Sequence, residues 1–172
     1  SSLAQNMYES LLNGQAAQTR VLSESDLQEI IAEANGRGFE HESFTSFIET
    51  GTLLGETVIS IAHCFREVHT IEINPPSYYA SRLASWRSQR PICFHRGVSE
   101  VVLLELLPLM QGPTVLFLDA HFSGGPTGGH DRQVPRLDEV RAIGRLLRHP
   151  ALIVIDDLHM FGEEHTFHRC DG

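Results

Sequence analysis

Short apolar runs alternate with segments of helical periodicity along most of the chain, and this alternation constrains the fold more than any other feature. The runs cover residues 44–48, 68–73, 92–95, 114–118 and 152–155. Strands that are apolar throughout and separated by helices are typical of a parallel sheet covered on both faces. The sequence therefore predicts a doubly wound, Rossmann-like α/β fold with a mostly parallel sheet of about five strands.

Helices are expected between these strands and ahead of the first one. A helix beginning at Pro75 should turn Tyr79, Leu83 and Trp86 toward the core, and Ser99 should cap the helix after it. A further helix is expected over residues 135–147, with Glu139 on its face.

The N-terminal segment carries helical patterns and no candidate chemistry. Ser25, with Gln28 three residues later, predicts a capping box at the start of a helix. We therefore expect residues 1–40 to form a helical segment packed on the core. Residues 41–172 would form the Rossmann-like domain itself.

Composition and charge exclude several functional classes. The 172 residues include 13 Lys and Arg against 22 Asp and Glu, and the net charge of -9 argues against nucleic acid as a partner. No apolar run approaches the ~18 residues of a membrane span and no signal segment opens the chain, so a cytoplasmic protein without membrane contact is expected. The three cysteines are widely spaced without CxxC, which indicates neither a disulfide framework nor a zinc knuckle.

Acidic residues end four of the five predicted strands. They are Glu49, Glu72, Asp119 and the pair Asp156-Asp157. The carboxyl ends of parallel strands meet at one edge of the sheet, and ligands of open parallel sheets bind there. A row of carboxylates at this edge suits a ligand that carries positive charge.

The segment ETGTLLGET (49–57) predicts a strand-to-helix turn with glycines four residues apart. Gly51 can take a positive φ and let a ligand approach the backbone, while Gly55 lets the following helix pack closely. The turn lacks the Lys of a phosphate-binding loop and does not match GxGxxG. Glu72, at the end of the next strand, stands where a carboxylate commonly binds ribose hydroxyls. For residues 49–57, the alternative interpretation is an ordinary tight turn between a strand and a helix that binds no ligand.

Four segments together resemble the class I S-adenosylmethionine-dependent methyltransferases. They are FIETGTLLGET (47–57), VHTIEIN (68–74), FLDAHFSGG (117–125) and LIVIDD (152–157). The last two resemble a bacterial methyltransferase-like group, and their acids are similar to those of metal-dependent sugar O-methyltransferases of the macrocin type. The resemblance implies S-adenosyl-L-methionine as the cofactor. The last two strands usual in the family have no counterpart, so a C-terminally truncated domain is expected.

The resemblance also implies roles for individual residues. The implied cofactor contacts are Glu49, Thr50, Gly51, Thr52, Gly55, Glu72, Ile73, Gly97, Ser99 and Asp119. Asp119, Asp156 and Asp157 would face the acceptor and bind a metal such as Mg²⁺, which prefers carboxylate oxygens. Asp119 or His121 would be the catalytic group that takes a proton from a hydroxyl acceptor. Val98 stands where many such families have Asp.

Three functions are compatible with these features. The first is methyl transfer, with or without Mg²⁺, to oxygen of a small-molecule acceptor that is polar or sugar-like. The second is a non-catalytic, methyltransferase-like binding module, which Val98 and the missing strands favour. The third is a hydrolase that would use Asp119, His121, Asp156 and Asp157 with Mg²⁺ or Mn²⁺ and would have no affinity for the cofactor. The sequence does not indicate an oligomeric state.

Overall fold

The computed structural model of the chain describes residues 21–36, 44–88, 90–119 and 136–156. Its centre is a five-stranded sheet in the order β3-β2-β1-β4-β5, and every neighbouring pair is parallel. The strands are β1 (Ser46–Thr50), β2 (Glu67–Glu72), β3 (Cys93–Arg96), β4 (Thr114–Leu118) and β5 (Ala151–Ile155). The predicted Rossmann-like parallel sheet is therefore confirmed.

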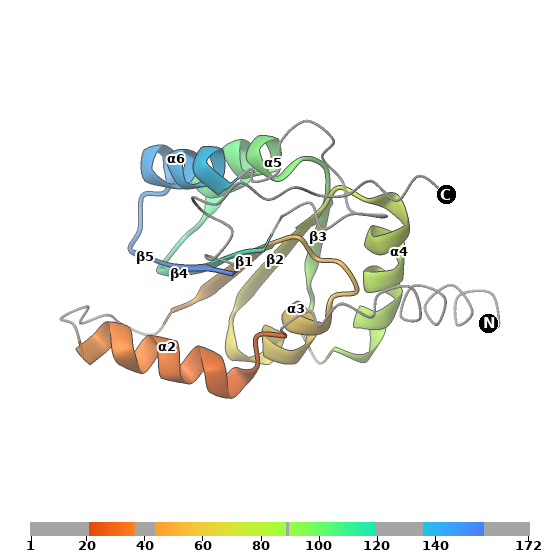
Figure 1. Cartoon of the computed structure of the whole chain (residues 1–172), viewed down its shortest axis with the longest axis horizontal. Helices are drawn as coiled ribbons and strands as arrows, with labels where there is room; N and C mark the ends of the chain where they lie inside the picture. Colours follow the sequence, from red (N-terminus) through yellow and green to blue (C-terminus); the bar gives the residue numbers. More distant parts are fainter. Residues whose placement is uncertain (1–20, 37–43, 89, 120–135, 157–172) are drawn as a thin grey trace, which may run out of the picture.

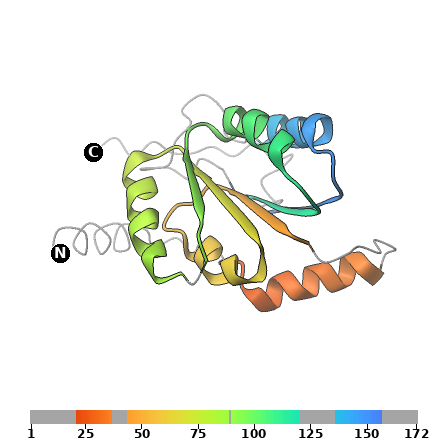
Figure 2. The same ribbon diagram turned by 180° about the vertical axis from the view of Figure 1, so that it is seen from behind.

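Helices cover both faces of the sheet. They are α2 (Glu24–Gly36), α3 (Glu56–Ile61), α4 (Pro75–Ala84), α5 (Ser99–Leu106) and α6 (Arg136–Leu146), with short 3-10 helices η1 (Ala62–Cys64), η2 (Ser85–Arg87) and η3 (Leu107–Leu109). Helices α5 and α6 lie on one side of the sheet, and α2 and α3 lie on the other (Figure 1). The view from behind shows α4 beside β2 and β3 (Figure 2), which it contacts.

The core has two parts because alternate side chains of each strand point to opposite faces. Phe47 of β1 packs with Val58 of α3 on one face, whereas Ile48 packs with Leu103 of α5 on the other. All five residues of β1 and of β4 are buried. Burial on both faces explains why these strands are not amphipathic in the sequence.

Helix α2 begins at a different cap from the predicted one. The Ser23 N–H donates to Asp26 Oδ2 at 3.0 Å, and the Asp26 N–H donates to Ser23 Oγ at 3.2 Å. This reciprocal pair forms a capping box two residues before the one predicted at Ser25. Leu27 of α2 is buried in the same apolar cluster as Phe47.

The expected orientation of α4 is wrong. Tyr79, Leu83 and Trp86 are 55%, 51% and 92% exposed, respectively. The buried residues of α4 are the small ones, including Ser81, because the helix passes close to the turn before α3. A Cβ placed on Gly55 would lie 3.0 Å from Ser81 Cβ, which leaves no room for large side chains on this face.

The expected cap of α5 is also wrong. Val98 occupies the N-cap position without a side-chain hydrogen bond, and Ser99 is the first helical residue. Among the described residues, no helix combines the length and the apolar character that crossing a membrane requires.

Candidate functional site

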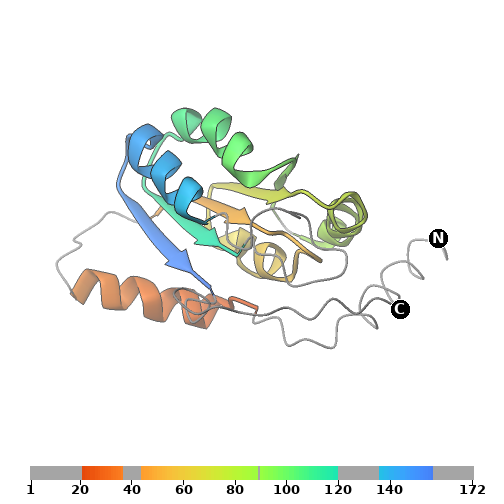
Figure 3. The ribbon, with the colours of Figure 1, turned by 45° about the horizontal axis from the view of Figure 1, so that its top comes forward.

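The carboxyl ends of all five strands meet at one edge of the sheet, where the arrowheads point in Figure 3. Strand β1 lies between β2 and β4, so the strand order reverses direction here, and open parallel sheets bind ligands next to such a point. Backbone bonds continue the ladder beyond the strands: the Asp119 N–H donates to Thr50 O at 3.0 Å, and the Asp156 N–H donates to Leu118 O at 3.2 Å. Asp119 and Asp156 therefore follow neighbouring strands at the same edge.

The turn between β1 and α3 has three residues in the left-handed region. Gly51 has a φ of 85° and Gly55 a φ of 79°, and the positive φ predicted for Gly51 is thus confirmed. Leu53 has a φ of 48°, although left-handed backbone costs a residue with a side chain about 1–2 kcal/mol. Its N–H donates to Glu72 Oε2 at 2.7 Å, and this bond holds the strained turn.

Glu72, at the end of β2, joins this turn to the start of α4. While Oε2 accepts from Leu53, Oε1 accepts from the Asn74 N–H at 2.7 Å. Burial raises the pKa of Glu72, and hydrogen bonds from the backbone of Asn74, Leu53 and Ile73 act in the opposite direction. Each carboxylate oxygen retains capacity for another hydrogen bond, so this fixed carboxylate can still receive ligand hydroxyls.

Glu49 lies inside β1 instead of following it. It is 2% exposed, and Thr70 Oγ1 donates to its Oε2 at 2.6 Å. Burial raises the pKa of Glu49 well above its ordinary value; the bond from Thr70 acts against this, and the charges of Asp119 and Glu72 add to the rise. Among the predicted strand-end acids, Asp119 and Glu72 therefore lie close enough to Glu49 for their charges to affect its pKa. Thr70 Oγ1 is also hydrogen-bonded to Thr52 Oγ1 of the turn.

The other predicted cofactor residues lie at the ends of β1 and β2 and at the start of α5. The Gly97 N–H donates to Glu72 O at 3.0 Å, which places the start of α5, with Ser99, next to the end of β2. Ile73 is 38% exposed at this end of β2. Thr50 ends β1, and its buried hydroxyl has no hydrogen-bond partner among the described residues.

The predicted metal site is only partly within the described residues. Asp119 and Asp156 are described, whereas Asp157 and the candidate base His121 lie outside the described ranges. Within those ranges, the only group of three metal-ligating side chains with all ligand atoms within 4.8 Å does not include these acids. The magnesium site thus stays a prediction.

Glu139 is a buried acid that the sequence analysis placed only on a helix face. It lies in the first turn of α6 and is 0% exposed. Ala142 and Ile143, three and four residues later, belong to the core cluster between α6 and the sheet. This i, i+3, i+4 spacing was the available signal, because it puts Glu139 on the apolar stripe of its helix.

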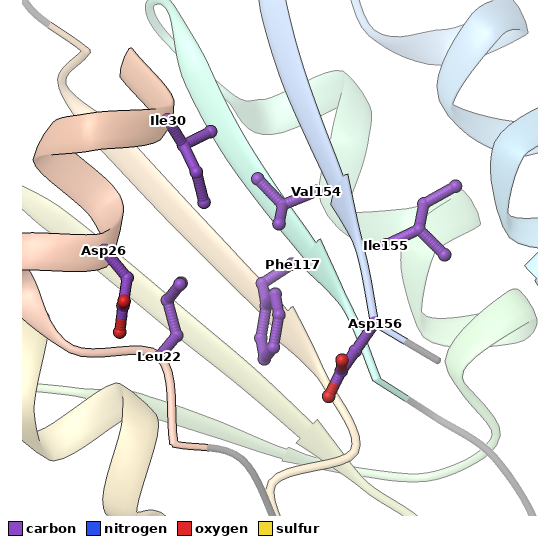
Figure 4. A pocket seen from close by; sticks show the side chains of 7 residues that line it. All are labelled: Leu22, Asp26, Ile30, Phe117, Val154, Ile155 and Asp156. Atoms are coloured by element: carbon purple, nitrogen blue, oxygen red, sulfur yellow. The ribbon is translucent and has the colours of Figure 1, made fainter. Parts of the chain in front are cut away.

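A pocket of about 180 Å³ opens between α2 and the ends of β4 and β5. Figure 4 shows Asp26 of α2 and Asp156 after β5 on either side of Leu22 and Phe117. Its lining residues are Leu22, Asp26, Ile30, Phe117, Val154, Ile155 and Asp156. Apolar walls with two carboxylates can hold a small molecule that has both apolar and hydrogen-bonding groups.

Comparison with known proteins identifies the fold. No family model and no curated protein sequence matches the chain. The cofactor-bound protein Rv0187 from MTB superposes with a TM-score of 0.55 at 16% identity, over 90% of this chain and 63% of that one. SAM-bound CalS10, an amino pentose methyltransferase from Micromonospora echinaspora involved in calicheamicin biosynthesis, superposes with a TM-score of 0.50 at 14% identity, over 86% of this chain and 54% of that one.

These similarities show that the chain has the Rossmann-like fold of the class I S-adenosylmethionine-dependent methyltransferases. It spans 63% of the length of Rv0187 and 54% of the length of CalS10.

Proposed function

We propose that the chain binds S-adenosylmethionine at the carboxyl edge of β1 and β2 and transfers its methyl group to oxygen of a small polar or sugar-like acceptor. The observation that carries this proposal is the left-handed glycine turn, pinned by the buried carboxylate of Glu72 at the reversal point of the sheet. CalS10, which shares the fold, acts on an amino pentose, and this supports a sugar-like acceptor.

The residues at this edge fit the proposed cofactor. Gly51 presents backbone without a side chain, so the methionine part can approach it closely. Glu72 is held where it can accept from both ribose hydroxyls, and exposed Val98, after Gly97, offers an apolar surface to the adenine ring. The carboxyl groups of Glu49, Glu72 and Asp119 would stabilise the positive charges of the sulfonium and ammonium groups.

The chemistry needs an acceptor oxygen positioned in line with the methyl group and a place for its proton. The bound cofactor supplies an electrophilic methyl group. Asp119 and His121 are the proposed proton acceptors, with positioning by the site accounting for much of the rate. Asp119, Asp156 and Asp157 would supply the carboxylate oxygens that Mg²⁺ prefers.

The pocket beside α2 is the proposed acceptor site. It adjoins Asp156, whose backbone is bonded to β4 one residue before Asp119. The side chains of Leu22 and Phe117 would pack against the apolar part of the acceptor. The carboxylates of Asp26 and Asp156 would accept hydrogen bonds from its hydroxyl groups.

Calorimetric titration with S-adenosylhomocysteine tests cofactor binding directly. Hydrogen bonds to a charged group contribute about 1.5–3 kcal/mol, so Glu72→Gln should weaken binding by about 10- to 150-fold. Glu105→Gln is the matched control, because Glu105 is an exposed glutamate of α5. Thermal unfolding of each variant establishes that it is folded.

Absence of binding to the wild-type chain, or equal binding by both variants, would contradict the cofactor site. Binding without methyl transfer to a panel of sugars and other small alcohols would favour the non-catalytic module. Hydrolysis that depends on Mg²⁺ or Mn²⁺ without cofactor binding would favour the hydrolase.

A further inference from the structure

Three exposed side chains of types that ligate metals meet at the start of α2. Glu24 is the first residue of α2, and His63 and Cys64 belong to η1, about 40 residues later in the chain. One potential ligand atom from each residue lies within 4.8 Å of the other two. The three come from different elements, so the cluster is a product of the fold and not of a local sequence motif.

The distances between these atoms are close to the spacing of ligands around zinc. His63 Nε2 lies 3.0 Å from Glu24 Oε2, and Cys64 Sγ lies 3.6 Å from His63 Nε2. In a tetrahedral zinc site, bonds of about 2.0–2.3 Å place neighbouring ligand atoms about 3.3–3.8 Å apart. The first of these distances is a few tenths of an ångström below that range, the second lies within it, and the third, between Glu24 and Cys64, is below 4.8 Å.

The chemistry of the three ligands selects the type of metal. Mg²⁺ and Ca²⁺ take oxygen ligands, whereas a set of one imidazole, one thiolate and one carboxylate is typical of Zn²⁺. Gln28 Nε2 donates to Glu24 Oε1 at 3.1 Å, so the second carboxylate oxygen is already held by a neighbour. Such outer partners orient ligands and commonly strengthen metal binding.

The charges of the ligands also suit a cation. The Cys64 sulfur and a Glu24 carboxylate oxygen lie within 4.8 Å of each other. A dication between them would offset the repulsion of a thiolate and a carboxylate.

From this geometry we infer that Glu24, His63 and Cys64 bind one Zn²⁺, with a water molecule as the fourth ligand. The ion ties the start of α2 to η1. Two hydrogen bonds already join these parts of the chain: the Leu22 N–H donates to Thr57 Oγ1 at 3.2 Å, and Ser60 Oγ donates to Leu22 O at 3.3 Å. Because α2 forms one wall of the pocket in Figure 4, the ion holds that wall in place.

Cobalt substitution reports on the thiolate directly. Co²⁺ added to the reduced full chain should produce a near-ultraviolet band of sulfur-to-cobalt charge transfer that saturates at one equivalent. Cys64→Ser should abolish the band. Cys93→Ser is the matched control, because Cys93 is an exposed cysteine on β3 and should leave it unchanged.

Zinc affinity, measured by competition with a chromophoric chelator, tests the other ligands. His63→Ala and Glu24→Gln should each weaken binding about tenfold or more. A variant with both His165 and His168 replaced by Ala should bind as the wild type does, which separates this site from the C-terminal histidines.

Unfolding provides a readout that does not depend on spectroscopy. With free Zn²⁺ about 100-fold above the dissociation constant, the unfolding midpoint of the wild type and of Cys93→Ser should rise by about 5–10 °C. Cys64→Ser should show no such rise. A cobalt band that persists in Cys64→Ser, or zinc binding that His63→Ala leaves unchanged, would overturn the inference.

Discussion

Gly55 offers a direct test of how the candidate site is built. Alanine at this position would meet two penalties, because the residue has a φ of 79° and its Cβ would lie 3.0 Å from Ser81 Cβ. Left-handed backbone costs about 1–2 kcal/mol, and overpacking of a tight contact costs about 1–3 kcal/mol. Alanine also lowers the conformational entropy of the unfolded chain, which stabilises the folded state by about 0.4–1 kcal/mol. We expect Gly55→Ala to lower the free energy of unfolding by about 1–5 kcal/mol.

Urea denaturation followed by circular dichroism measures this change in free energy. In thermal unfolding, the midpoint temperature should fall by about 2–20 °C. A double-mutant cycle separates the two penalties. Ser81→Gly removes the atom that the new Cβ would meet, so the double variant should be more stable than the sum of the single effects predicts, by about 1 kcal/mol. The backbone penalty should remain.

Gly144→Ala is the control for glycine replacement itself. Apart from its chain neighbours and the backbone of its own helix, no atom of the described residues lies within 4 Å of a Cβ at Gly144, which is inside α6, so alanine should stabilise the chain by about 1 kcal/mol. If Gly55→Ala instead unfolds within about 0.5 kcal/mol of the wild type, the turn does not have the conformation described here, and the argument for close packing against α4 is refuted.

Three other predictions concern charge and exposure. Burial raises the pKa of Glu49 in the folded chain, so the folded state holds this proton more tightly than the unfolded state does. The free energy of unfolding should therefore fall as the pH rises from the ordinary pKa of glutamate through the raised pKa of Glu49. Glu49→Gln should remove this pH dependence in denaturation measured at several pH values. Affinity for S-adenosylhomocysteine should fall as the pH drops through the raised pKa of Glu72, because the protonated acid accepts fewer hydrogen bonds from the ribose hydroxyls. In calorimetric titrations, Glu72→Gln should lack this pH dependence. Trp86, the single tryptophan, is 92% exposed, so iodide should quench its emission as it quenches free indole, and protected emission would show that another surface covers it.

The strands could be predicted because burial on both faces leaves a continuous apolar run. The predicted bounds 114–118 are those of β4, while β1 lies two residues later than expected because buried Glu49 and Thr50 extend it. The acid ends the apolar run in the sequence but continues the strand in the fold. A polar residue whose partner is supplied by a neighbouring strand, as Thr70 is for Glu49, cannot be recognised from its own segment.

The prediction of which face of α4 is buried was wrong for a related reason. Helical spacing identified a stripe of Tyr79, Leu83 and Trp86, but spacing does not show which stripe faces the sheet. The close approach of α4 to Gly55 selects the small residues, and this contact joins segments 26 positions apart. The cluster of Glu24, His63 and Cys64 could not be predicted from the sequence either, because only the packing of α2 against η1 brings its members together.

The acids at the carboxyl edge oppose folding and favour binding through the same interaction. Burial raises the pKa of Glu49 and the charges of Asp119 and Glu72 add to this rise, so both groups repel an ionised Glu49 in the absence of a cation. A cationic ligand that reduces this repulsion must lower the same pKa values, and it must therefore release protons as it binds. By linkage, the number of protons released at a given pH equals the slope of the logarithm of affinity against pH. Calorimetry in buffers of different ionisation enthalpy measures the release, and titrations at several pH values measure the slope. Agreement between the two, with both lost in Glu49→Gln, would locate the positive charge of the ligand beside these acids.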